Sequence, residues 1–220
     1  MNAFLQKALT AIVLLVIFLF LFLYPPPFVT ALFVVAILIY IIFFEWQKII
    51  AALGLNKYFF PITIIYPILP ATLVAYMCTD YSYRILIFFM VFLIFANDTG
   101  GYIIGSLIGK HKLAPSISPK KTWEGFLGGY LFTLMMLYLI LFFSKPTAST
   151  SFLFLFSLSV SILATAGDLF ESFLKRKVGI KDSGSILPGH GGLLDRFDSF
   201  LTVIFLFFAL RHYLLKIFDI

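Results

Sequence analysis

The sequence predicts an all-α fold, a polytopic integral membrane bundle of about seven transmembrane helices. Apolar residues make up 62% of its 220 residues, only 12% are charged, and the mean hydropathy is +1.07. Soluble globular domains are about half apolar and about a quarter charged. The apolar residues also form long uncharged runs, and a helix needs about 20 such residues to cross a bilayer. A soluble domain is therefore excluded, and the single cysteine excludes a disulfide scaffold.

The uncharged runs place the spans along the chain. They are expected at residues 8–24, 28–44, 58–78, 85–109, 123–143, 152–172 and 193–215. The first resembles a signal peptide, but it ends in the prolines of residues 25–27 and not in a small-residue cleavage site, so we expect a retained span. The second ends where Glu45 and Trp46 suit the headgroup level. The prolines within the third predict kinks.

The basic residues predict the orientation of the bundle, because Lys and Arg accumulate on the cytoplasmic side of a membrane. With the N-terminus inside, all but four of the 16 Lys and Arg fall on that side. The exceptions are Arg84, Lys145, Arg211 and Lys216. The long loops at 110–122 and 173–192 then both face the cytoplasm. We therefore expect a multi-pass protein of the cell (inner) membrane with a cytoplasmic active site.

Acidic residues gather in and beside the last four spans, which makes them candidates for a functional site. A carboxylate near hydrocarbon is costly unless it faces water, a cation or a basic partner, and structural salt bridging is the alternative. Asp168 and Lys175 share one helical stripe, and Asp195 and Asp198 are three residues apart at the start of the last span. Two helix ends can thus present three carboxylates to one point, and oxygen ligands suit a hard cation such as Mg2+. The expected parts of a single domain, 1–220, are N-terminal spans at 1–96, a catalytic motif region at 97–198 and a last span at 199–220.

The two long loops carry the basic half of such a site. Several glycines accompany the basic residues of loop 173–192, and residues 118–122 read SPKKT. Glycine lets backbone N–H groups approach phosphate, and Lys or Arg neutralises it. A basic loop that only sets topology and binds anionic lipid is the open alternative. His190, flanked by glycines, is a candidate for proton transfer or for a bond to a headgroup.

Motifs between residues 97 and 198 together carry a family resemblance. They are NDTGGY at 97–102, GKHKLAP at 109–115, SPKKTWEG at 118–125, GDLFES at 167–172, SFLKR at 172–176, KDSG at 181–184 and LPGHGGLLDRFD at 187–198. These stretches resemble the signature of the phosphatidate cytidylyltransferases, or CDP-diacylglycerol synthases, as does the pair Glu45–Trp46. Asn97 and Gly101 stand where that family often has alanine, and the stretch between the second and fourth spans is shorter than in typical bacterial members.

The resemblance implies a reaction in which phosphatidic acid attacks the α-phosphorus of CTP, giving CDP-diacylglycerol and pyrophosphate for phospholipid biosynthesis. The implied catalytic residues are Asp168, Asp195, Asp198, Lys181, Asp182 and His190. Those implied to bind substrate are Ser118, Lys120, Lys121, Thr122, Lys175, Arg176 and Arg196. Those implied to hold Mg2+ are Asp168, Asp195, Asp198 and Asp98, with a second, monovalent cation left open. CTP, phosphatidic acid and membrane lipids are the expected partners, nucleic acid is not, and a homodimer is left open.

Two other functions are weighed against this one. Another CTP- or CDP-dependent lipid enzyme, such as a CDP-alcohol phosphatidyltransferase, should carry a D-x-x-D-G-x-x-A-R motif that this chain lacks. An ion-coupled transporter should show repeat symmetry with broken helices in matching halves. Here the acids crowd into residues 98–198, and the first 97 residues hold only Glu45 and Asp80.

Overall fold

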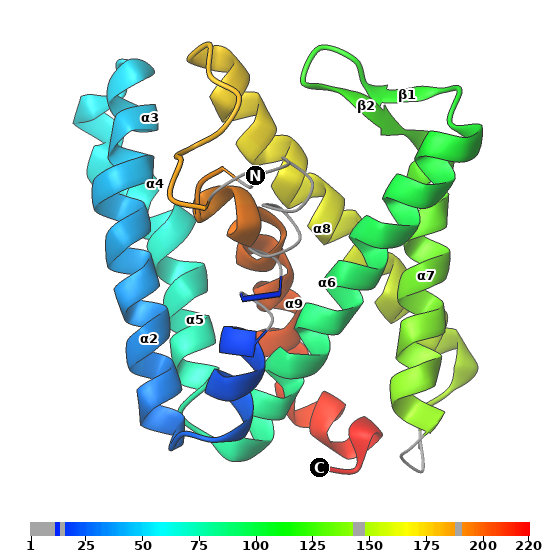
Figure 1. Ribbon diagram of the computed structural model, residues 1–220. Coiled ribbons are helices and arrows are strands. Elements are labelled where there is room, and N and C mark those ends of the chain that lie inside the picture. The colour runs from blue at the N-terminus through cyan, green and yellow to red at the C-terminus, as the bar shows by residue number, and fades with distance from the viewer. Residues whose placement is uncertain (1–11, 14–15, 143–147, 188–190) are drawn as a thin grey trace.

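The structure is a bundle of membrane helices, and it is a computed structural model that describes residues 12–13, 16–142, 148–187 and 191–220 (Figure 1). Its elements in chain order are α2 (Pro27–Tyr40), η1 (Ile41–Trp46), α3 (Gln47–Ala52), η2 (Asn56–Tyr58), α4 (Phe59–Thr63), η3 (Ile64–Ile68), α5 (Leu69–Met77), α6 (Tyr81–Ile108), β1 (Lys112–Ala114), β2 (Ser118–Thr122), α7 (Trp123–Phe142), α8 (Thr150–Lys177) and α9 (Leu194–Phe218).

Six helical segments of the described chain are long and apolar enough to cross a membrane, which confirms the predicted all-α polytopic class. They are Pro27–Ala52, Phe59–Met77, Tyr81–Ile108, Trp123–Phe142, Thr150–Lys177 and Leu194–Phe218. Of the first predicted span, residues 12–13 and 16–23 are helical, and the rest lies outside the described residues. Of the kinks predicted at Pro61, Pro67 and Pro70, the structure shows the one at Pro67, where Tyr66 has the non-helical angles φ −148° and ψ 110°. Pro61 and Pro70 lie within the regular helices α4 and α5.

The second span extends past its predicted end, which corrects the placement of Glu45 and Trp46 at the headgroup level. The helix continues from α2 through the π-helical turn η1 into α3. Glu45 is 1% exposed and Trp46 is fully buried. The indole Nε1 of Trp46 donates to Thr63 Oγ1 at 2.8 Å, so its polar edge has a partner inside the protein. Both residues therefore face the bundle and not the lipid.

Two apolar clusters hold the bundle together. The larger lies among α5 to α9, with Phe207 of α9 fully buried against Phe156 of α8. The smaller joins the N-terminal helices to the start of α9, where Trp46 and Ile49 share one cluster with Leu194 and Leu201. The beginning of α9 is therefore packed from both halves of the chain.

Helices α6 and α7 approach closely through glycines, as small residues allow in membrane bundles. A Cβ atom on Gly128 would lie 2.8 Å from the carbonyl oxygen of Gly100. A Cβ atom on Gly129 would lie 2.8 Å from that of Asn97. The antiparallel hairpin β1–β2 connects these helices in place of the loop expected at 110–122, with Lys112 opposite Thr122. Figure 1 shows the hairpin at the same end of the bundle as α3 and the segment that follows α8.

Candidate functional site

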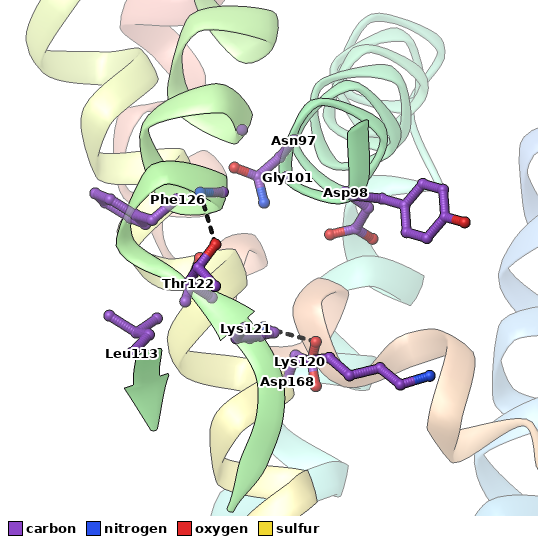
Figure 2. Close-up of a pocket in the computed structure, with 13 residues that line it drawn as sticks. Asn97, Asp98, Gly101, Leu113, Lys120, Lys121, Thr122, Phe126 and Asp168 are labelled. Atoms are coloured by element: carbon purple, nitrogen blue, oxygen red, sulfur yellow. Dashed lines mark hydrogen bonds and ion pairs between the residues drawn. The ribbon is translucent and has the colours of Figure 1, made fainter. Parts of the chain in front are cut away.

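A cavity of about 240 Å³ lies under the hairpin, between α6, α7 and α8 (Figure 2). We call it the hairpin cavity. Its charged lining residues are Asp98, Lys120, Lys121 and Asp168. Phe126 and Leu113 contribute apolar surface. The cavity therefore combines two cationic and two anionic side chains at the end of a membrane bundle.

An ion pair links the hairpin to the floor of the cavity. Lys121 Nζ lies 2.6 Å from Asp168 Oδ2, and Figure 2 shows this side chain reaching from β2 toward α8. The hydroxyl of Ser172 donates to the other oxygen of Asp168 at 3.1 Å. The two charged side chains are 25% and 34% exposed, so water and soluble anions can reach the pair. Lys120 and Asp98 are exposed beside it.

Hydrogen bonds at the start of α7 fix the hairpin above the cavity. The hydroxyl of Thr122, which is buried, accepts from the backbone N–H of Gly125 at 3.1 Å. The Glu124 carboxylate accepts from the backbone N–H of Lys110 at 3.1 Å and pairs with His111 Nδ1 at 2.6 Å. Thr122 thus caps a helix while it lines the cavity, and Glu124 ties the two ends of the hairpin together.

A second group of charged residues lies at the start of α9 and is almost entirely buried. Lys175 Nζ lies 2.9 Å from Glu171 Oε2 and 2.6 Å from Asp195 Oδ1. Asp195 also accepts from the backbone N–H of Ser183 at 2.9 Å and from that of Gly192 at 2.7 Å. One lysine is therefore shared by two carboxylates, and Asp195 fastens the segment that precedes α9.

Glu45 joins this group from the N-terminal half, and the sequence analysis did not include it among the site residues. Its carboxylate accepts from the backbone N–H groups of Leu193 and Leu194 at 2.9 and 2.7 Å, and from the hydroxyl of Ser183 at 3.1 Å. Two features of the sequence pointed to Glu45: it is an acid beside an apolar run, and the pair Glu45–Trp46 resembles the family signature.

The four predicted cation ligands do not form one cluster in this structure. Asp98, Asp168 and Asp198 come from three helices, and the negative charges of Asp98 and Asp168 repel that of Asp198. Asp195 is turned to Lys175 and the backbone instead. Among the residues that the structure describes, no three His, Cys, Asp or Glu side chains are grouped closely enough to hold a metal ion.

The chemistry of the oxygen donors still fits a hard cation. The second carboxylate oxygen of Glu171 and the hydroxyl of Tyr66 are buried without a hydrogen-bond partner in the described part of the chain. Tyr66 lies near the carboxylates of Glu171, Asp198 and Asp168. Unpaired buried oxygens beside carboxylates are the kind of ligand that Mg2+ accepts. The donor types thus fit the expected ion.

The remaining predicted residues that the structure describes lie on β2, at the end of α8, on α9 and on the segment between α8 and α9. Arg176 is exposed, and its guanidinium donates to the carbonyl of Ile180 at 3.0 Å. Lys181 and Asp182 are exposed on the segment between α8 and α9. Arg196 is exposed on α9 and interacts electrostatically with Asp98, and Ser118 is half-buried in β2. His190 lies outside the described residues.

The fold and the site define a polytopic membrane protein in which carboxylates and lysines meet at one end of the bundle. Residues 55–214 match the model of the cytidylyltransferase family, and the chain belongs to this family. It is 50% identical over 126 residues to a phosphatidate cytidylyltransferase of Staphylococcus haemolyticus, covering 57% of this chain and 48% of the relative. The relative of the same name from Bacillus subtilis is 47% identical over 125 residues, covering 56% of this chain and 46% of the relative. The chain thus spans about half the length of the curated relatives it matches.

Proposed function

We propose that the protein transfers CMP from CTP to phosphatidic acid, giving CDP-diacylglycerol and pyrophosphate. The hairpin cavity carries this proposal, because it brings Lys120 and Lys121 together with Asp98 and Asp168 at the end of a membrane bundle. A lipid headgroup and a soluble nucleotide can both reach such a place. Membership of the cytidylyltransferase family supports the same reaction, and the excess of Lys and Arg supports a cytoplasmic location.

The lysines of the hairpin would bind phosphate. The ammonium group of Lys121 is paired with Asp168 at 2.6 Å, and an incoming phosphate would offer it a second, stronger anionic partner. Lys120, exposed beside it, would neutralise a further phosphate oxygen. Arg176, Lys181 and Arg196 are exposed on neighbouring elements and would attract the triphosphate from water. Two polyanions can then meet without strong mutual repulsion.

The carboxylates of the site would have two different roles, cation binding and the positioning of the segment before α9. Asp98, Asp168 and Asp198 would hold Mg2+, which, when bound, offsets negative charge on phosphate oxygens. Asp195 would act differently, because its oxygens are committed to Lys175 and to backbone N–H groups. We assign it to shaping the segment before α9. The phosphate of phosphatidic acid is itself the nucleophile, so orientation and charge placement would supply most of the rate without a strong general base.

The test is an assay of the purified protein in detergent with CTP, phosphatidic acid and Mg2+. We expect equal amounts of CDP-diacylglycerol, measured by mass spectrometry, and of pyrophosphate. Diacylglycerol in place of phosphatidic acid is the control, because it lacks the phosphate nucleophile and should give neither product. If no CDP-diacylglycerol forms over a range of lipid compositions and Mg2+ concentrations, the proposal is wrong.

A further inference from the structure

The carboxylate of Glu45 is buried among partners that carry no charge of their own. It is 1% exposed, and its described hydrogen-bond donors are two backbone N–H groups and one hydroxyl. A buried carboxylate is costly unless hydrogen bonds replace its lost hydration. All three donors come from residues more than 130 positions later in the chain, with sequence separations of 138, 148 and 149. The tertiary fold alone brings them to Glu45.

Two of these donors belong to the beginning of α9, where backbone N–H groups have no partner within the helix. The N-cap residue of α9 is Leu193, whose apolar side chain cannot accept a hydrogen bond. Glu45 accepts from Leu193 N and Leu194 N, and so it caps α9 from another helix. The positive end of the helix dipole favours a carboxylate at this place. The π-helical turn η1 carries Glu45 to this position.

The segment before α9 is fitted closely around the same carboxylate. A Cβ atom on Gly184 would lie 2.6 Å from Glu45 Oε1, and one on Gly192 would lie 2.7 Å from that oxygen. Ser183 is held from two sides, because its hydroxyl donates to Glu45 and its backbone N–H donates to Asp195. Glu45 and Asp195 thus fasten one segment jointly, and Asp195 in turn holds Lys175.

We infer that Glu45 is a positioning residue for the reaction. It fixes Ser183, Leu193 and the first turn of α9, and through them the orientation of Asp195 and Asp198. This role rests on the proposed function, but the contacts that define it do not. Glu45 also lies upstream of residues 55–214, the part of the chain that the family model matches.

The first test is tryptic cleavage of the purified protein in detergent. Lys181 is exposed on the segment that Glu45 holds, and Lys112 is exposed on the hairpin. In Glu45→Gln, the side-chain NH2 group replaces one carboxylate oxygen. It cannot accept the hydrogen bond that this oxygen accepts in the wild type. Losing one hydrogen bond to a charged group should raise the rate of cleavage after Lys181 about tenfold or more, because cleavage follows the population of the open segment. Cleavage after Lys112 should not change.

The matched control is Thr30→Val, which removes the bond from the buried Thr30 hydroxyl to the carbonyl of Leu21 and touches neither Glu45 nor the segment before α9. Trypsin should cleave this variant after Lys181 at the same rate as the wild type. If Glu45→Gln does not fold, Ser183→Ala replaces it, and removing this one bond should raise the cleavage rate about fivefold. Wild-type cleavage after Lys181 in whichever of the two variants folds would overturn the inference.

The second test separates positioning from mere stability. In Glu45→Gln, kcat for CDP-diacylglycerol should fall at least tenfold while KM for CTP changes less than threefold, because misplaced groups affect the reacting geometry most. Glu45→Asp keeps the charge and should recover part of kcat. A faster cleavage after Lys181 with an unchanged kcat would refute the positioning role. If the wild-type protein forms no CDP-diacylglycerol, the proposed function is wrong. The rate of cleavage after Lys181 would still decide whether Glu45 holds the segment.

Discussion

Replacing Lys175 with methionine tests whether one shared cation stabilises the start of α9. The Lys175 side chain is 10% exposed, and its partners Glu171 and Asp195 are 0% and 5% exposed. Methionine is of similar length and removes only the charge and its hydrogen bonds. Two buried carboxylates are then left without their cation, and breaking a buried ion pair costs about 3–5 kcal/mol. Because 1 kcal/mol shifts Tm by roughly 2–4 °C for chains of this size, we expect Tm to fall by about 10 °C.

The assay is thermal unfolding in one detergent, followed for the wild type and three variants. Lys177→Met is the matched control, since Lys177 is exposed in the same last turn of α8 and its loss should cost under about 1 kcal/mol. Combining Lys175→Met with Glu171→Gln removes one of the unpaired charges and should recover part of the loss. Equal Tm values for Lys175→Met and Lys177→Met would refute the reasoning.

Three further outcomes are expected from the same structure. Lys121→Met breaks a half-exposed ion pair and should change stability by no more than about 1 kcal/mol, yet it should lower kcat/KM for CTP at least tenfold relative to the exposed-lysine control Lys110→Met. Gly128→Ala should lower stability by about 1–3 kcal/mol, measured by unfolding, because its Cβ atom would crowd the backbone of α6. Gly101→Ala, whose Cβ atom would meet only an ordinary contact at 3.5 Å, should cost less, and equal losses would contradict the close packing. Removing Mg2+ with EDTA should abolish formation of CDP-diacylglycerol, and restoring Mg2+ should recover it; activity that persists in EDTA would remove the cation from the proposal.

The spans could be predicted from the sequence because each is a local property. An uncharged run of about 20 residues can satisfy its backbone only as a helix in lipid, whatever its neighbours are. The third predicted span, 58–78, therefore agrees closely with Phe59–Met77. The hairpin could not be predicted in this way. Its strands have three and five residues and are rich in lysine, and they are held by the glycine contacts of α6 and α7 and by Glu124.

The acidic residues differ in their partners, and the spacing of these residues in the sequence does not predict those partners. Asp195 and Asp198 are three residues apart and were expected to share one role. In the structure Asp195 accepts hydrogen bonds from Lys175 and from the backbone of residues 183 and 192, whereas Asp198 lies near the like charges of Asp168 and Asp98. Helical periodicity fixes which residues share a stripe, but it does not fix which partners face that stripe.

Glu45 shows how far the functional unit extends along the chain. Local composition placed it at a headgroup, because a charged residue after an apolar run usually ends a span. Its true partners begin 138 residues later, and Trp46 beside it packs in one apolar cluster with Leu194 at the first turn of α9. Hydrogen bonds and apolar contacts thus tie the same turn to the second span. The family model begins at residue 55, yet the segment that carries Asp195 and Asp198 is held by contacts from residues 45 and 46. The unit that builds the site therefore includes η1, and changes in this helical turn should affect groups on α9 as directly as changes in the motifs themselves.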